Sequence, residues 1–205
     1  MKWPKAGMTA FRMAERGTVR TNAWVDGRPP LHVMAWAFRE AAATILKNIE
    51  SGGLNDVLVY PYLFNWRHFI ELEMKSLIPL ARDYHELPEK PLKLHHFIAD
   101  YWKELRPLIE KASGSAEDSD ALAGADAIIA EFVTYDPDSF TFRYPTSKGG
   151  DRPLERVPRV LNLRQFHDSM EGIANFFDGV YCQMFESVSN RNENYYANMP
   201  DWRDT

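Results

Sequence analysis

The sequence predicts an all-α protein, an antiparallel up-and-down bundle of about five helices with a long loop or a small hairpin before the last helix. Three observations lead to this prediction. Apolar residues recur at three- and four-residue steps over several long stretches. Polar, glycine-containing or proline-flanked links separate these stretches, and short links between long helices favour antiparallel neighbours. A hydrophobic fraction of 45% over 205 residues is enough for one sizeable core.

The first two predicted helices form a hairpin. Residues 31–49 place their apolar positions on one helical face, and the glycine pair at 52–53 ends this helix because glycine readily takes the left-handed conformation. Residues 55–84 are apolar on most sides, which is typical of the central helix of a bundle. Pro61 fits the first turn of this helix, whereas Pro79 is expected to kink or end its main body.

Three further segments complete the predicted bundle. A third helix is expected over residues 94–111, with a bend at Pro107. The polar segment 113–119 leads into a fourth helix, whose apolar stripe continues to Val133. The last helix starts at Asn162, because a glutamine three positions later completes a pattern that resembles a capping box.

Outside the helices, the sequence divides into three kinds of segment. Residues 1–30 have no sustained period and are predicted to form an irregular arm before a single bundle domain at 31–188. Residues 189–205 are predicted to be a polar, frayed tail. Between residues 136 and 161 turn chemistry dominates around a short extended piece at 140–145, and such a long loop tends to be functional.

Charge and cysteine content narrow the class of protein. The net charge of −5 argues against coating nucleic acid or membrane through bulk charge, although a local basic patch stays open. Cys182 is the single cysteine, so no intramolecular disulfide forms, and its apolar neighbours predict a buried structural thiol. The sequence shows neither a signal peptide nor a membrane span, so we expect a cytoplasmic protein that does not enter the membrane.

Charged residues interrupt the apolar second helix. Arg67, Glu71 and Lys75 are spaced four apart and therefore share one flank, with His68 beside them. An arginine next to a histidine suits a phosphodiester, because the imidazole can carry a proton and the guanidinium can hold developing charge. The alternative is an internal ion pair that pins the central helix to its neighbours.

A histidine pair, His95 and His96, lies at the expected start of the third helix. Adjacent residues on a helix point about 100° apart, so at most one of the two rings faces inward and the pair does not share a metal ion. The Glu-x-x-His pairs of a di-iron bundle do not occur in the sequence. We predict neither a metal nor a cofactor.

The long loop carries a cationic segment. Arg143, Tyr144 and Lys148 stand just before the glycine pair at 149–150, and such a flexible cationic loop can contact phosphate. The spacing of a nucleotide-binding P-loop is absent. In the structural alternative, Arg143 caps a helix end or reaches Glu71. Arg164 and His167 on the last helix are interpreted as a solvated face.

The order of these features resembles a family of bacterial helical proteins related to the HEPN superfamily. The resemblance covers about residues 55–185. The segments that carry it are Tyr60-Pro61-Tyr62-Leu63-Phe64, then Arg67 to Lys75, the histidine at 95 or 96 ahead of Trp102, Asp136-Pro137-Asp138-Ser139, and Phe142-Arg143-Tyr144-Pro145.

The resemblance implies a helical bundle that forms a homodimer and has an RNA- or nucleotide-related role in bacterial defence or stress. Many members of the superfamily are metal-independent ribonucleases, with an arginine and a histidine at the joint of two protomers. Their signature, Arg followed after four to six residues by His, does not occur in this sequence. The predicted site groups the following residues: for catalysis Arg67, His68, Glu71 and His95 or His96, and for substrate binding Lys75, Arg143, Tyr144 and Lys148. The alternative is a non-enzymatic scaffold or interaction protein, in which the polar cluster is structural and the partner is another protein.

Overall fold

The computed structural model describes residues 3–8, 10, 11, 23, 25, 27–113 and 116–197, without the side chains of 116–118, 196 and 197. Its elements, in chain order, are α1 (Leu31–Glu50), α2 (Asn55–Tyr84), α3 (Ile98–Ala112), α4 (Ala116–Tyr135), the 3-10 helix η2 (Pro153–Arg156) and α5 (Leu163–Ala197). The all-α prediction is confirmed. The described residues contain no strand, so the small hairpin offered as an alternative for the long loop was wrong.

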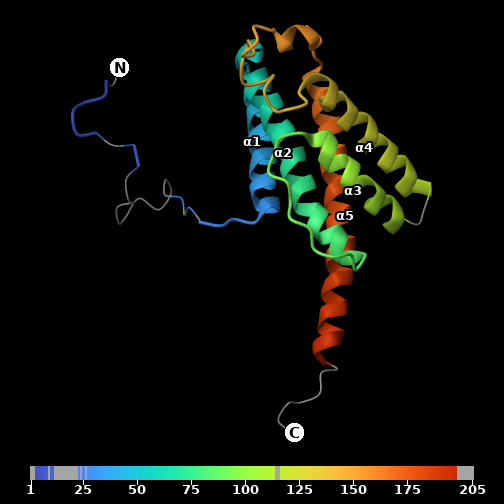
Figure 1. The fold of residues 1–205 in the computed structure, drawn as a ribbon. Helices are drawn as coiled ribbons and strands as arrows, with labels where there is room; N and C mark the ends of the chain where they lie inside the picture. The colour runs from blue at the N-terminus through green and yellow to red at the C-terminus, as the bar shows by residue number, and fades with distance from the viewer. Residues whose placement is uncertain are drawn as a thin grey trace.

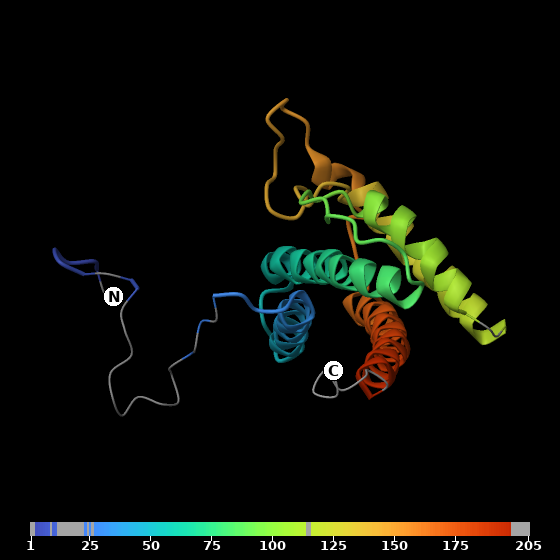
Figure 2. The same ribbon diagram turned by 60° about the horizontal axis from the view of Figure 1, so that its bottom comes forward.

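Helix α2 is the centre of the bundle. It packs against α1, α3 and α5, while α4 packs against α3 and α5 (Figures 1 and 2). Residues 69–75 are all buried, and seven consecutive residues cover every side of a helix with about 3.6 residues per turn. This burial confirms the prediction that the apolar second helix is the central one.

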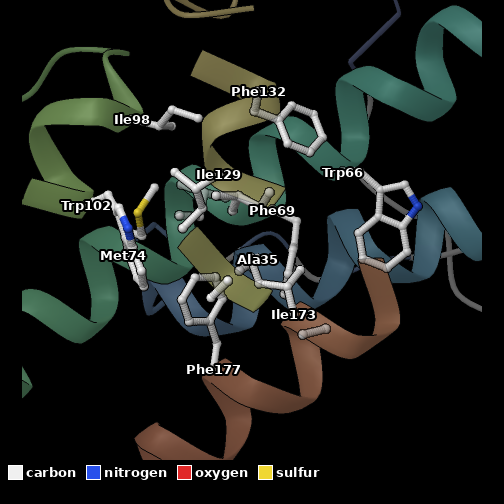
Figure 3. Close-up of a cluster of buried hydrophobic side chains, with 14 of the residues drawn as sticks. Ala35, Trp66, Phe69, Met74, Ile98, Trp102, Ile129, Phe132, Ile173 and Phe177 are labelled. Atoms are coloured by element: carbon white, nitrogen blue, oxygen red, sulfur yellow. The ribbon is translucent and has the colours of Figure 1, made fainter. Parts of the chain in front are cut away.

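All five helices contribute to one hydrophobic core. Figure 3 shows side chains from each helix meeting around α2. Burying one such large apolar side chain stabilises the fold by about 1.5–3 kcal/mol. The labelled members are Ala35 of α1, Trp66, Phe69 and Met74 of α2, Ile98 and Trp102 of α3, Ile129 and Phe132 of α4, and Ile173 and Phe177 of α5.

Three helix ends follow the sequence prediction. Helix α1 ends before Gly52, which has φ +92°. Helix α5 begins after Asn162, whose Oδ1 accepts a hydrogen bond of 3.1 Å from the backbone N–H of Gln165. Helix α2 continues through Pro79 to Tyr84, so the predicted range of residues 55–84 is confirmed, and of the two alternatives for Pro79 the one in which it ends the main body of the helix was wrong. Its buried neighbours Ile78 and Ala81 hold the helix against the core on both sides of the proline.

The last helix is longer than predicted. Helix α5 runs to Ala197, so residues 189–197 are helical rather than a frayed tail, and residues 198–205 lie outside the described residues. Figure 1 shows this end of α5 projecting past the other helices. Val188 is still buried, and Arg191 forms an ion pair with Asp83 of α2. These contacts explain why polar composition alone did not end the helix.

Side-chain hydrogen bonds fold the start of the long loop into a turn. Asp136 Oδ1 accepts from the backbone N–H of Thr141 at 2.8 Å, and Thr141 Oγ1 donates to the carbonyl oxygen of Tyr135 at 2.8 Å. Residues 141–143 therefore form a turn, and the extended piece predicted at 140–145 was wrong. Further along, the loop contains η2 and packs over the end of the α1–α2 hairpin.

Two smaller predictions concern Cys182 and the arm. Cys182 is exposed, so the buried structural thiol was wrong: Val180 and Met184 face the core, and a residue two positions from each points to the opposite side of the helix. Among the described residues of the arm, none is helical, as predicted. None of the described helices is long and apolar enough to cross a membrane.

Candidate functional site

Arg67 is fully buried and ties three segments of the chain together. Its Nε donates to the carbonyl oxygen of Asp136 at 3.0 Å, at the end of α4. Its Nη2 donates to the carbonyl oxygen of His96 at 2.6 Å, in the link between α2 and α3. Its Nη1 donates to Glu71 Oε2 at 3.1 Å on the next turn of α2. The guanidinium thus joins the central helix to both loops that flank it.

Glu71 is the acceptor at the centre of this arrangement. Besides Arg67, it accepts a hydrogen bond from Lys75 Nζ at 2.6 Å and one from His96 Nδ1 at 2.9 Å, both to Oε1. Burial alone raises the pKa of this carboxyl, but the hydrogen bonds from Lys75 and His96 and the nearby positive charges outweigh it, so the pKa lies below its ordinary value. Glu71 is therefore an ionised carboxylate at neutral pH.

We call Arg67, Glu71, Lys75 and His96 the ion cluster. Burial lowers the pKa of Arg67, while the charge of Glu71 counteracts that effect, and a guanidinium stays charged in any case. Lys75 is also buried, with its Nζ 5.1 Å from the centre of the Tyr101 ring. The internal ion pair that the four-residue spacing predicted is present, with both oxygens of Glu71 accepting from cluster members.

His96 is the one member of the ion cluster that reaches solvent. About half of its side chain, 57%, is exposed, whereas the other three members are buried. Because Glu71 is an ionised acceptor, Nδ1 of His96 carries the hydrogen of this contact. An imidazole oriented in this way by a carboxylate has the geometry of a general base.

His68 does not join the ion cluster. Its ring is half-buried and stacked on Phe64, with ring centres 5.7 Å apart and an interplanar angle of 10°, and Phe38 of α1 meets it edge-on at 4.4 Å. Burial lowers the pKa of His68, which favours the neutral imidazole. The sequence predicted that His68 lies beside Glu71. In the structure its ring points toward α1 instead, because His68 is one position after Arg67 and so lies on another side of α2.

Arg143 and Tyr144 belong to the same group as His68. The Arg143 guanidinium lies 5.7 Å from the centres of both the Phe64 and the Tyr144 rings, and its Nε donates to the carbonyl oxygen of Ser139 at 2.5 Å. Arg143 therefore contacts residues of its own loop and Phe64 of α2. The contact with Glu71, offered as an alternative, was wrong. We call Phe64, His68, Arg143 and Tyr144 the stacked group.

His95 and Lys148 lie outside both groups. The His95 ring stacks on Tyr101 with centres 4.7 Å apart, and its Nδ1 accepts from the backbone N–H of Phe97 at 3.2 Å. Both histidines precede α3, which begins at Ile98 rather than at residue 94, so their divergence comes from an irregular link and not from a helical turn. Lys148 is exposed within the turn that Ser147 closes.

On α5, the predicted solvated face is correct for one residue and wrong for the other. Arg164 is exposed and paired with Glu50. His167 is half-buried beside the Trp66 ring, with centres 5.7 Å apart, and its Nδ1 is buried without a hydrogen-bond partner. No local pattern predicts this burial, because Trp66 lies on a helix about a hundred residues earlier in the chain.

Two residues of the observed arrangement were absent from the predicted site. Asp136 supplies a carbonyl oxygen to Arg67, and burial raises the pKa of its own carboxyl. Phe64 connects His68 with Arg143. The signal for Phe64 was available, since it precedes His68 by one helical turn. The signal for Asp136 was weaker, because a residue of any type can accept a hydrogen bond through its backbone carbonyl oxygen.

The larger cavities do not open onto the ion cluster. One of about 580 Å³ lies between the end of the α1–α2 hairpin and the loop before α5, with Tyr60, Phe142 and Val160 in its wall. Another of about 780 Å³ lies beside the end of α2, near Arg82 and Leu92. In the part of the chain that the structure describes, no group of three or more His, Cys, Asp or Glu residues could hold a metal ion.

Comparison of this chain with known protein families, with characterised proteins and with solved structures finds no significant match.

Proposed function

We propose that this chain is a non-enzymatic interaction protein and that the ion cluster is a structural lock for its bundle. The observation that carries the proposal is the complete burial of Arg67, with its donors on Asp136, His96 and Glu71. A guanidinium that binds a phosphodiester must present N–H groups to it. Those of Arg67 are engaged by protein oxygens.

Releasing Arg67 toward a substrate would be costly. Glu71 would lose one of the cations that pair with it. The carbonyl oxygens of Asp136 and His96 would lose a charged hydrogen-bond donor. Removing one partner of a buried ion pair costs about 3–5 kcal/mol. A loss of this size is comparable to a large part of the stability of a typical domain. The lock thus supports a structural role for these charges.

A second candidate, metal-independent RNA cleavage, is favoured by the pair of His96 and Glu71. The exposed imidazole and the buried carboxylate provide an oriented base without any further group. The resemblance to the HEPN superfamily supports this candidate as well. The stacked group would then contribute aromatic and cationic surface for a nucleotide, through Arg143 and Tyr144.

One experiment distinguishes the two candidates. Wild-type protein is incubated with single-stranded RNA in the presence of EDTA, beside His96→Ala and, as a matched control, His95→Ala. The control removes a neighbouring imidazole that is stacked on Tyr101 rather than bound to Glu71. We expect no cleavage by any of the three proteins. Circular dichroism confirms that each remains folded.

Cleavage by wild type that falls about a hundredfold or more in His96→Ala, and not in His95→Ala, would replace the proposal with the second candidate. Because His96 is mostly exposed, its loss can be measured in a folded protein. Cleavage that persists equally in all three would point to a contaminating nuclease and would leave the absence of enzymatic activity in place.

A further inference from the structure

The cavity at the end of the α1–α2 hairpin has apolar walls. It has a volume of about 580 Å³ and lies between this end of the hairpin and the loop before α5, which Figure 1 shows next to each other. Three segments contribute buried side chains to its wall, namely Leu46 and Ile49 of α1, Leu63 of α2 and Phe142 of the loop. Sites for small molecules are clefts of about 300–1,000 Å³ with mainly apolar walls and a few polar groups. This cavity therefore has the size and the wall of a small-molecule site.

A second cavity adjoins the first. It has a volume of about 170 Å³ and reaches Phe132 and Tyr135 at the end of α4. Five residues belong to the walls of both cavities: Leu63, Phe142, Val157, Pro158 and Leu161. Because these walls are shared, the apolar space continues past the first cavity toward α4. Such a shape suits an elongated apolar group.

The rim of the first cavity carries an available cation. Its exposed charged residues are Arg159, Arg164, Glu50 and Asp56. Arg164 pairs with Glu50, and Asp56 lies in the first turn of α2, where the positive end of the helix favours a carboxylate. Within the described residues, Arg159 has neither a hydrogen bond nor an ion pair. Its guanidinium is free to bind the two oxygens of a carboxylate through parallel hydrogen bonds.

The segment around this rim differs in charge from the rest of the chain. Residues 143–164 contain six Lys or Arg and two Asp or Glu, a net charge of +4. Since the whole chain carries −5, all other residues together carry −9. A local basic segment of this kind attracts anions to the mouth of the cavity although the protein as a whole is acidic.

We propose that this cavity binds a small monocarboxylate with a linear alkyl chain, in which the carboxylate pairs with Arg159 and the chain lies against Leu63 and Phe142. The inference goes beyond the proposed function, because this cavity does not open onto the ion cluster. A single negative charge fits the rim, since one guanidinium is available. A phosphate dianion would bring a second charge close to Glu50 and Asp56.

An alkyl carboxylate uses both features of the site. Nucleic acid would use the cations of residues 143–164 but would leave the apolar cavity unfilled. A neutral apolar molecule would fill the cavity and leave Arg159 without a partner. The combination of an apolar cavity and one available guanidinium at its rim therefore favours a ligand with an apolar chain and one acidic end.

Isothermal titration calorimetry on the full-length chain tests the two parts of the ligand separately. Octanoate is compared with hexanoate, which has a shorter chain, and with octan-1-ol, which keeps the chain and lacks the carboxylate. Octanoate should bind more tightly than hexanoate by about fourfold for each added CH₂ group. It should bind more tightly than octan-1-ol by about tenfold or more, because the alcohol forms no hydrogen bond between two charged groups. Octanoate should also raise Tm, because it binds the folded chain.

Two matched pairs of variants locate the site. Arg159→Met removes the rim cation, whereas Arg156→Met removes an exposed arginine of the same segment that is not part of the cavity wall. Val160→Glu adds a negative charge at the rim, and Leu94→Glu makes the same kind of change elsewhere, at a residue that is likewise 89% exposed. The affinity for octanoate should fall about tenfold or more in Arg159→Met and Val160→Glu and stay close to the wild-type value in the two controls. All four positions are exposed, so the variants should fold.

Three results overturn the proposal directly. They are no binding of octanoate at millimolar concentration, binding of octan-1-ol as tight as that of octanoate, and an equal loss of affinity in the rim variants and their controls. Two other occupants would also overturn it. An RNA oligonucleotide that displaces octanoate and binds more weakly to both Arg156→Met and Arg159→Met would make the segment a phosphate-binding surface. A mass of twice 23.7 kDa that returns to that of one chain in Val160→Glu would mean that a second copy covers the cavity.

Discussion

Glu71 and Glu73 are both buried on α2, two positions apart and on different sides of the helix, yet their surroundings differ completely. Glu71 accepts from Arg67, Lys75 and His96, and its pKa lies below the ordinary value. In the described part of the structure Glu73 has no hydrogen bond or ion pair, and burial raises its pKa to about 7. A buried carboxylate is stable only on the side of α2 that provides donors.

The side of α2 that carries Glu73 also has a cation nearby. Arg39 of α1 lies close enough to lower the pKa of Glu73, but it directs its donors to α5, where it binds Glu171 and Asp178. Asp178 in turn raises the pKa of Glu73. Arg39 thus links α1 to α5 and gives no hydrogen bond to Glu73. Proximity to a cation therefore does not replace a hydrogen bond from it.

The largest expected effect comes from the Glu71 side. Arg67→Met keeps most of the side-chain volume and removes the charge, so the free energy of unfolding should fall by about 3–5 kcal/mol. Urea titration of the full chain measures it. The control is Arg152→Met, which removes an exposed pair with Glu155 and should be close to neutral. Equal losses in the two variants would show that the ion cluster is not a lock.

The next effect concerns Glu73 and pH. Its pKa of about 7 in the folded protein exceeds the ordinary 4.5, so between these values the folded chain binds more protons than the unfolded chain. The contribution of Glu73 to stability is therefore greatest at low pH and is lost as pH rises toward and through 7. Glu73→Gln stays neutral, and it should stabilise the protein by on the order of 3 kcal/mol at alkaline pH and have little effect near pH 4.

Unfolding in urea at a series of pH values checks this expectation, with Glu71→Gln as the contrasting variant. The lowered pKa of Glu71 contributes stability that is present above the ordinary carboxyl pKa and is lost as pH falls through the folded value. Glu71→Gln should therefore destabilise the protein most at neutral and alkaline pH. If the two variants respond to pH with the same sign, the contrast between the two sides of α2 is wrong.

The smallest effect links the two helices that flank Glu73. Arg39→Met removes a partly exposed cation, so its direct cost should be about 1 kcal/mol or less. It should also move the titration midpoint of Glu73 upward, because Arg39 lowers that pKa. Carboxyl-carbon NMR titration of Glu73 measures the midpoint in wild type and variant. A downward movement would mean that Asp178 responds to the loss of its partner more strongly than Glu73 does.

Much of the fold could be predicted from local patterns. Apolar spacing located α1 and α2, and Asn162 marked the start of α5, because these signals depend on neighbours within one or two turns. The end of α5 could not be predicted in this way. Its last turns are held by Val188 and by the pair of Arg191 with Asp83, whose members are about a hundred residues apart in the chain.

The sequence likewise predicted some contacts of the candidate site and not others. The four-residue spacing correctly placed Arg67, Glu71 and Lys75 together. The spacing could not show that Arg143 meets Phe64 instead of Glu71, since that contact depends on how the loop before α5 folds. Nor did the spacing single out Glu73, because the sequence does not show whether hydrogen-bond donors surround a glutamate in an apolar helix.

Local spacing was enough to predict which segments are helical and which residues of α2 share a flank, because helix geometry repeats every few residues. The surroundings of the two buried glutamates beyond α2 itself were settled by the packing of distant segments. The carbonyl oxygens of Asp136 and His96 accept from Arg67, the imidazole of His96 donates to Glu71 from the link before α3, and the cation of α1 binds α5. Burial sets the energy of each charge, and burial is a property of the assembled bundle.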